Sequence, residues 1–182
     1  ERTLGAVQVA MGLLALATLP VYGQTFELMR WLHSAVGRTP EGYAAFNAGS
    51  HAIAMLVMFP AAFCAGMTLP LITHVLLRRG AGEGVIGRVY AANTLGAIAG
   101  VVFAINALPA LGLKGVVVAG AAIDVALGLV LLAGAATGPA LRLAALCSAA
   151  AFAGIVVLVD LDPLKMVSGV YRDGRVLRPG EA

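Results

Sequence analysis

Only a few side chains in this 182-residue chain could do chemistry within its long apolar runs. Asp124 is the most informative of them, because it is the single charge between Gly115 and Leu141. An ionisable group inside a membrane is costly and by default marks a functional site, such as one that binds a cation. A structural role stays open, in which a protonated Asp124 bonds a neighbouring helix.

Three further polar side chains could form a site with Asp124. Thr68 and His74 lie in the charge-free run from 42 to 77, and Asn93 lies in the next such run. An amide such as Asn93 can bridge two membrane helices, whereas a histidine near a helix end more commonly caps the helix or meets the interface. By depth in the membrane, Thr68 and Asn93 are the nearest candidate partners of Asp124.

No catalytic or metal-binding motif accompanies these residues. The sequence contains no G-x-S-x-G, no H-E-x-x-H and no phosphate-binding loop. We therefore expect no catalysis, cofactor or metal on this chain alone. Cys64 and Cys147 lie in apolar runs and match no metal-ligand spacing, so each is expected to act as a small buried hydrophobic residue.

Small residues recur at helical spacing in two of the apolar runs. One stripe repeats at every fourth residue and consists of Ala92, Gly96, Gly100 and Ala104. Gly120 and Gly128 flank Asp124 on a similar stripe. Small side chains let membrane helices approach closely, and Gly96 and Gly100 form a G-x-x-x-G pattern. We predict that both stripes contact other helices, with a substrate groove as the alternative.

Composition defines the environment of these residues. Hydrophobic residues make up 60% and charged residues 12% of the chain, and the mean hydropathy is +0.95. A soluble domain has about 45–50% apolar and about 25% charged residues. The chain therefore has too few charges for a water-facing surface, which argues against a soluble enzyme, a disordered segment and a nucleic-acid-binding protein.

The charge-free runs predict membrane-spanning helices. They are rich in Leu, Ala and Val without strict alternation, and most reach the length of about 20 residues that crosses a bilayer. They predict an all-α fold, a polytopic bundle of about five transmembrane helices over residues 1–160 with a short polar tail over 161–182. The expected helices are 4–26, 47–77, 86–108, 115–135 and 142–160.

The segments between these helices also carry predictions. Residues 27–46 are expected to form a loop long enough for a short interfacial helix over 26–35. Pro60 and Pro70 predict a kink in the second helix, because a proline removes an N–H and crowds the preceding turn. Residues 108–112 predict a tight turn.

Charges next to the spans predict the topology. Arg78, Arg79 and Arg88 form the densest positive cluster, so the loop that carries them is predicted to be cytoplasmic. The other basic residues then divide into Arg2 and Arg142 on the same side, and Arg30, Arg38 and Lys114 on the opposite side. Five spans would place the tail outside although it carries four basic residues. Either the tail is extracytoplasmic, or one apolar run does not cross.

Three ordered stretches resemble a known family. They read FPAAFCAGMTLPLIT at 59–73, GRVYAANTLGAIAG at 87–100 and LPALGL at 108–113. Together they are similar to the membrane portion of bacterial fused spermidine synthase-like proteins, also described as major-facilitator-like spermidine synthases. The similarity covers residues 55–115, and the remaining spans fit by hydropathy only.

This resemblance implies an aminopropyltransferase-like domain after the spans, and the opening of such a domain is similar to Ser168–Arg172. The chain ends at Ala182, before a nucleotide-binding turn or a catalytic acid of that domain. The catalytic residues of the family therefore have no counterpart in this sequence. We expect either an internal piece of such a protein or a shortened member kept for its membrane part.

Two functions remain open. The first is a noncatalytic inner-membrane module, either an anchor or a packing subunit, whose partners are the lipid bilayer and other membrane subunits or missing flanking segments of the same protein. The second is a carrier of a small molecule such as a polyamine, in which Asp124 faces the cation and the kinked second helix gates. Transporters often contain paired repeats. The five runs show no convincing repeat, which favours the module.

Overall fold

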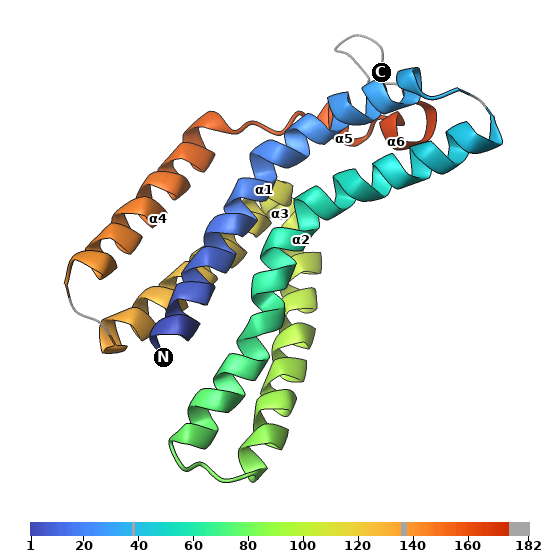
Figure 1. Cartoon of the computed structure of the whole chain (residues 1–182). Helices are drawn as coiled ribbons and strands as arrows, with labels where there is room; N and C mark the ends of the chain where they lie inside the picture. Colours follow the sequence, from blue (N-terminus) through green and yellow to red (C-terminus); the bar gives the residue numbers. More distant parts are fainter. Residues whose placement is uncertain (38, 136–137, 175–182) are drawn as a thin grey trace. The chain divides into compact units, whose positions relative to one another are not determined.

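The chain is helical throughout the part that the structure describes. The computed structural model describes residues 1–37, 39–135 and 138–174, and these ranges contain no strand. The helices in chain order are α1 (Arg2–Ala35), α2 (Pro40–Arg78), α3 (Gly84–Ala135), α4 (Pro139–Leu158), α5 (Pro163–Met166) and α6 (Val170–Asp173) (Figure 1). The predicted all-α class is confirmed.

Four of these helices, α1 to α4, are long and apolar enough to cross a membrane by length and composition. The sequence predicts about five spans, and the difference arises in α3. The two spans expected over 86–108 and 115–135 both lie within this one helix.

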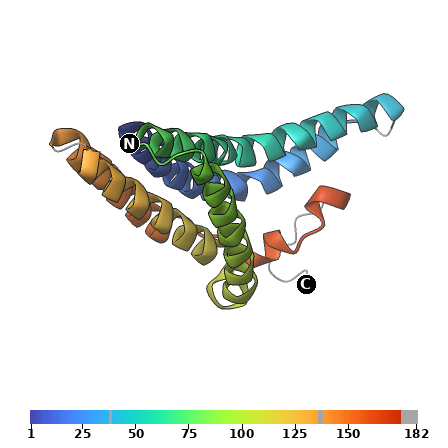
Figure 2. The same cartoon turned by 90° about the horizontal axis from the view of Figure 1, so that it is seen from below.

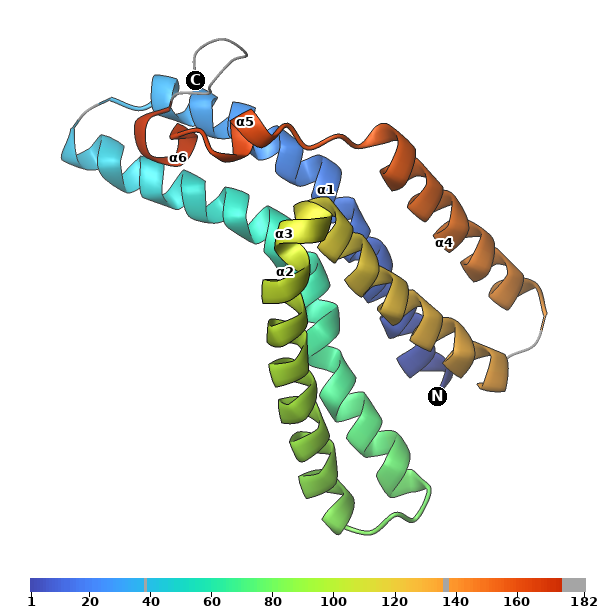
Figure 3. The same ribbon diagram turned by 180° about the vertical axis from the view of Figure 1, so that it is seen from behind.

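The backbone of α3 changes direction at Gly112, within the turn expected over 108–112. Gly112 has φ 66° and ψ 174°, a conformation that favours glycine, and Pro109 has no N–H to donate to a helical hydrogen bond. Two arms, 84–111 and 113–135, leave this kink in different directions (Figure 2, Figure 3). Each arm exceeds the length of about 20 residues that crosses a bilayer.

Helix α1 is longer than predicted. It continues through Pro20 to Ala35, so most of the first half of the loop expected over 27–46 is helical. Phe26, Met29 and Leu32 recur at helical spacing and are buried. Tertiary packing of an apolar face supplies most of the stability of a helix in a folded protein, which explains the extension.

Helix α2 begins earlier than predicted, at Pro40 instead of residue 47. Proline is favoured at the first position of a helix, because its missing N–H would have no partner there. Thr39 caps the helix: its Oγ1 accepts a hydrogen bond from the Gly42 amide at 3.1 Å. The helix continues through Pro60 and Pro70, and the kink expected there stays a prediction.

The helices group into two compact units, which are described separately. The first unit comprises residues 1–16 and 60–153, and the second comprises 17–59 and the described residues from 154 onward. In the first unit, the end of α2 runs beside the first arm of α3, and the start of α1 packs on the second arm (Figure 1, Figure 3).

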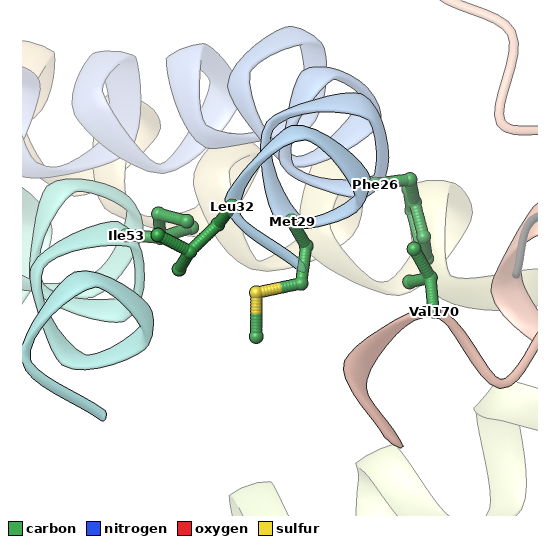
Figure 4. Close-up of a cluster of buried hydrophobic side chains, with 5 residues drawn as sticks. All are labelled: Phe26, Met29, Leu32, Ile53 and Val170. Carbon is green, nitrogen blue, oxygen red and sulfur yellow. The ribbon is translucent and has the colours of Figure 1, made fainter. Parts of the chain in front are cut away.

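The second unit has a small apolar core (Figure 4). Its buried members are Phe26, Met29 and Leu32 of α1, Ile53 of α2 and Val170 of α6. Val170 is fully buried, and Lys165 of α5 lies 3.9 Å from Glu27 of α1. The described part of the tail expected over 161–182 therefore packs on α1.

Candidate functional site

The start of α1 and the second arm of α3 approach each other at backbone distance. A Cβ atom placed on Gly128 would lie 2.7 Å from the Val9 nitrogen and 2.8 Å from the Gly5 carbonyl oxygen. One placed on Gly12 would lie 2.8 Å from the Ala121 carbonyl oxygen. Glycine leaves room for such an approach, as in other close pairs of membrane helices. Because Gly5 faces Gly128 and Gly12 faces Ala121, the two helices are antiparallel.

Asp124 lies at the edge of this contact. Ala121 and Gly128, about one turn away on either side, are buried, and Asp124 itself is half-buried. Among residues 1–37, 39–135 and 138–174, its carboxyl group forms no hydrogen bond or ion pair. An ionisable group with unused hydrogen-bonding capacity therefore borders a tight helix contact.

The partners expected for Asp124 lie elsewhere. The Thr68 hydroxyl donates to the Ala65 carbonyl oxygen of its own helix at 2.7 Å. Asn93 is exposed and has no hydrogen bond within the described part of the chain. Neither residue bonds Asp124 there, which differs from the expectation. The kink at Gly112 explains the separation of Asn93, which lies on the first arm of α3, from Asp124 on the second.

The small residues predicted to pack have unequal surroundings. Gly128 lies in the α1–α3 contact, whereas a Cβ on Gly120 would have open space around it. Gly96 and Gly100 on the first arm of α3 are also open, Ala92 is exposed and Ala104 is half-buried. No helix of the described chain packs on Gly96 or Gly100.

Gln8 is a polar residue in the α1–α3 contact that no motif or charge pattern singles out. Its Oε1 atom is buried and accepts no hydrogen bond from the described residues. Buried side-chain acceptors are normally satisfied, so this atom marks a place where a donor is expected. The available signal is spacing: Gln8 follows Gly5 by three residues and precedes Gly12 by four, which places all three on one side of a helix.

A basic cavity of about 570 Å³ lies between the start of α1 and the end of α2 in the first unit. Its lining residues are Glu1, Arg2, Thr3, Leu4, Leu71, His74, Val75, Arg78 and Arg79. His74 therefore lies beside three arginines at the helix ends and not in a site around Asp124. Arg2 lies at the same end of the unit as Arg78 and Arg79, as the predicted topology requires, and Arg79 forms an ion pair with Glu1.

A second cavity, of about 1040 Å³, lies at the connection between α1 and α2 in the second unit. His33 packs on Phe46 there with ring centroids 4.4 Å apart, and its Nε2 atom is buried without a partner among the described residues. Arg30, Tyr43 and Arg172 also line the cavity. The sequence gives no hint of this grouping, because His33 falls in the segment predicted to be a loop.

These features define the class of the protein: the described residues are helical, and four of their helices could cross a membrane. Within the described ranges, no three His, Cys, Asp or Glu side chains are grouped so that they could hold a metal ion. Comparisons with protein-family models, curated proteins and solved structures find no match to this chain. The similarity to spermidine synthase-like proteins therefore stays a prediction from the sequence motifs.

Proposed function

We propose that this chain is a noncatalytic integral membrane module, multi-pass in the cell inner membrane, that packs against helices of a larger membrane assembly. Four helices of sufficient length and apolar character support the membrane part of this proposal. The assembly part depends on the first arm of α3.

The exposed face of that arm carries the proposal. Every residue from 91 to 100 is exposed, including Asn93, Gly96 and Gly100. Lipid tails cannot satisfy the amide of Asn93, and glycines in a membrane helix are typical of surfaces where another backbone approaches. A polar amide beside a G-x-x-x-G pattern on an exposed apolar helix is thus better suited to a protein neighbour than to lipid.

The nature of the larger assembly rests on the sequence motifs at 59–73, 87–100 and 108–113. Their similarity to fused spermidine synthase-like proteins supports an anchor for a synthase-like domain, and a separate packing subunit is the other form of the same module. The intact mass of the native protein distinguishes the two forms. A mass far above 18.4 kDa supports the anchor, and a mass of 18.4 kDa supports the separate subunit.

Gly100→Leu should weaken the assembly by about 1–3 kcal/mol, the cost of forcing extra atoms into a packed contact. Light scattering of the complex extracted in a mild detergent measures the effect as a loss of mass. Gly87→Leu is the matched control, because Gly87 is equally open and lies on the opposite side of the helix from Gly96. Equal behaviour of the two variants would contradict the proposed interface.

The topology of the module gives a second prediction. A reporter that is active only in the periplasm, fused at Gly82, should be silent, because Arg78, Arg79 and Arg88 favour the cytoplasmic side. The same reporter fused at Gly37, in the preceding connection along the chain, should be active. A strong signal at Gly82 would invert the proposed orientation.

A carrier of a small cation such as a polyamine is the second candidate, and Asp124 is the observation that favours it. The carboxyl is half-buried in an apolar helix and has no cationic partner among the described residues. Uptake of labelled spermidine by proteoliposomes tests this function. Uptake by the wild type that is lost in Asp124→Asn would support the carrier, and no uptake by the wild type would exclude it.

A further inference from the structure

The basic cavity of the first unit combines two kinds of lining. Its polar lining contains three arginines and His74 but a single acid, Glu1, which pairs with Arg79. The remaining lining is mainly aliphatic and consists of Thr3, Leu4, Leu71 and Val75. The volume of about 570 Å³ lies in the range of about 300–1,000 Å³ that is usual for small-ligand sites.

The two kinds of lining are ordered along α2. Val75 lies one turn and Leu71 two turns before Arg78, and a rise of 1.5 Å per residue separates Leu71 from Arg78 by about 10 Å. The cavity is therefore apolar toward the middle of the helix and cationic toward its end. A ligand that fits this order has an anionic group at one end and a hydrocarbon chain at the other.

We propose that this cavity binds the headgroup of an anionic phospholipid. The phosphodiester would accept hydrogen bonds from the arginine guanidinium groups, and the first part of an acyl chain would lie along Leu71 and Val75. Basic pockets between membrane helices on the cytoplasmic side are the usual place for such headgroups. The inference rests on the proposed membrane insertion of the module, because it places the helix ends at the headgroup level.

Native mass spectrometry in a neutral detergent tests the site with two lipids of identical acyl chains, phosphatidylglycerol and phosphatidylcholine. The full chain should bind phosphatidylglycerol about tenfold more tightly, and Arg78→Gln/Arg79→Gln should remove that preference. The matched control is Arg88→Gln/Arg142→Gln, which removes the same charge from exposed positions outside the cavity. Thermal unfolding without lipid should be the same for both double variants, which shows that the cavity variant is folded.

Three results would overturn the inference. The first is an equal affinity of the full chain for both lipids. The second is an equal loss of the preference for phosphatidylglycerol in the control variant, which would indicate nonspecific attraction. The third is displacement of phosphatidylglycerol by millimolar inorganic phosphate, which would identify a free-anion site. Extraction of membranes with alkaline carbonate separates this inference from the proposed function. Release of the chain would overturn both, whereas retention without lipid preference would overturn the lipid site alone.

Discussion

Replacing Gly128 with leucine should destabilise the folded chain by about 1–3 kcal/mol. The atoms that a side chain would meet are the Val9 nitrogen and the Gly5 carbonyl oxygen, at 2.7 and 2.8 Å from the added Cβ. Backbone atoms cannot rotate aside as a flexible side chain can, so α1 and the second arm of α3 must separate. Thermal unfolding in detergent, followed by circular dichroism, measures the loss.

Gly120→Leu is the matched control for this prediction. It makes the same substitution two turns earlier on the same arm, where an added Cβ meets nothing within 4 Å. Leucine favours a helix over glycine by about 1 kcal/mol, so this variant should be as stable as the wild type or more stable. If Gly128→Leu is equally stable, the antiparallel contact between α1 and α3 is wrong.

The contrast between these two glycines shows that the sequence does not predict which of them another helix approaches. Both lie four residues from Asp124 on an apolar helix, so spacing alone treats them alike. Only the direction from which α1 approaches decides that Gly128 is enclosed and Gly120 is open. The helical class itself is predictable, because an apolar run in lipid must satisfy its backbone hydrogen bonds internally.

The lengths of the helices are less predictable, for two physical reasons. The kink at Gly112 depends on the φ and ψ angles of one residue, and both a loop and a kinked helix satisfy the same sequence pattern over 108–112. The end of α1 depends on tertiary contacts, since Phe26 and Met29 belong to a core that Val170 completes from far along the chain. Local patterns contain neither kind of information.

The candidate site also has one residue that the sequence singles out and one that it does not. Asp124 stands out in the sequence, because an acid in an apolar run is rare and costly. Its surroundings do not, since Gln8 is only one of several uncharged polar residues near the start of the chain. The buried and unsatisfied Oε1 atom of Gln8 becomes visible only when α1 lies against α3.

The structure has no hydrogen bond between Asp124 and Gln8. We expect that a rotation of either side chain lets Asp124 donate one to Gln8 across the α1–α3 contact. Gln8 lies between Gly5, which faces Gly128, and Gly12, which faces Ala121, so it is level with the part of α3 that contains Asp124. Its Oε1 atom needs a donor, and a neutral carboxyl group has one O–H to give. Neither group has a hydrogen bond to another described residue, so each supplies what the other lacks.

A double-mutant cycle tests this pair. Gln8→Leu and Asp124→Leu should each destabilise the chain. The double variant should be less destabilised than the sum by about 0.6–1.7 kcal/mol, between the average and the maximum coupling typical of hydrogen bonds between membrane helices. Asp124→Asn should keep most of the stability, because an amide also donates to Oε1. Gln8→Leu combined with Asn106→Leu is the control, since the Asn106 amide already donates to Val102 of its own helix at 2.7 Å.

The cycle also separates the two functions proposed for Asp124. A structural carboxyl predicts coupling to Gln8 and a stable Asp124→Asn variant with no change in cation uptake. A cation-binding carboxyl predicts that the same variant stays folded and loses uptake, because an amide keeps the hydrogen bond but not the charge. Additive effects within about 0.3–0.5 kcal/mol would mean that the two side chains do not interact. Additivity together with unchanged uptake would remove both roles, and the exposed first arm of α3 would then be the main functional surface of the module.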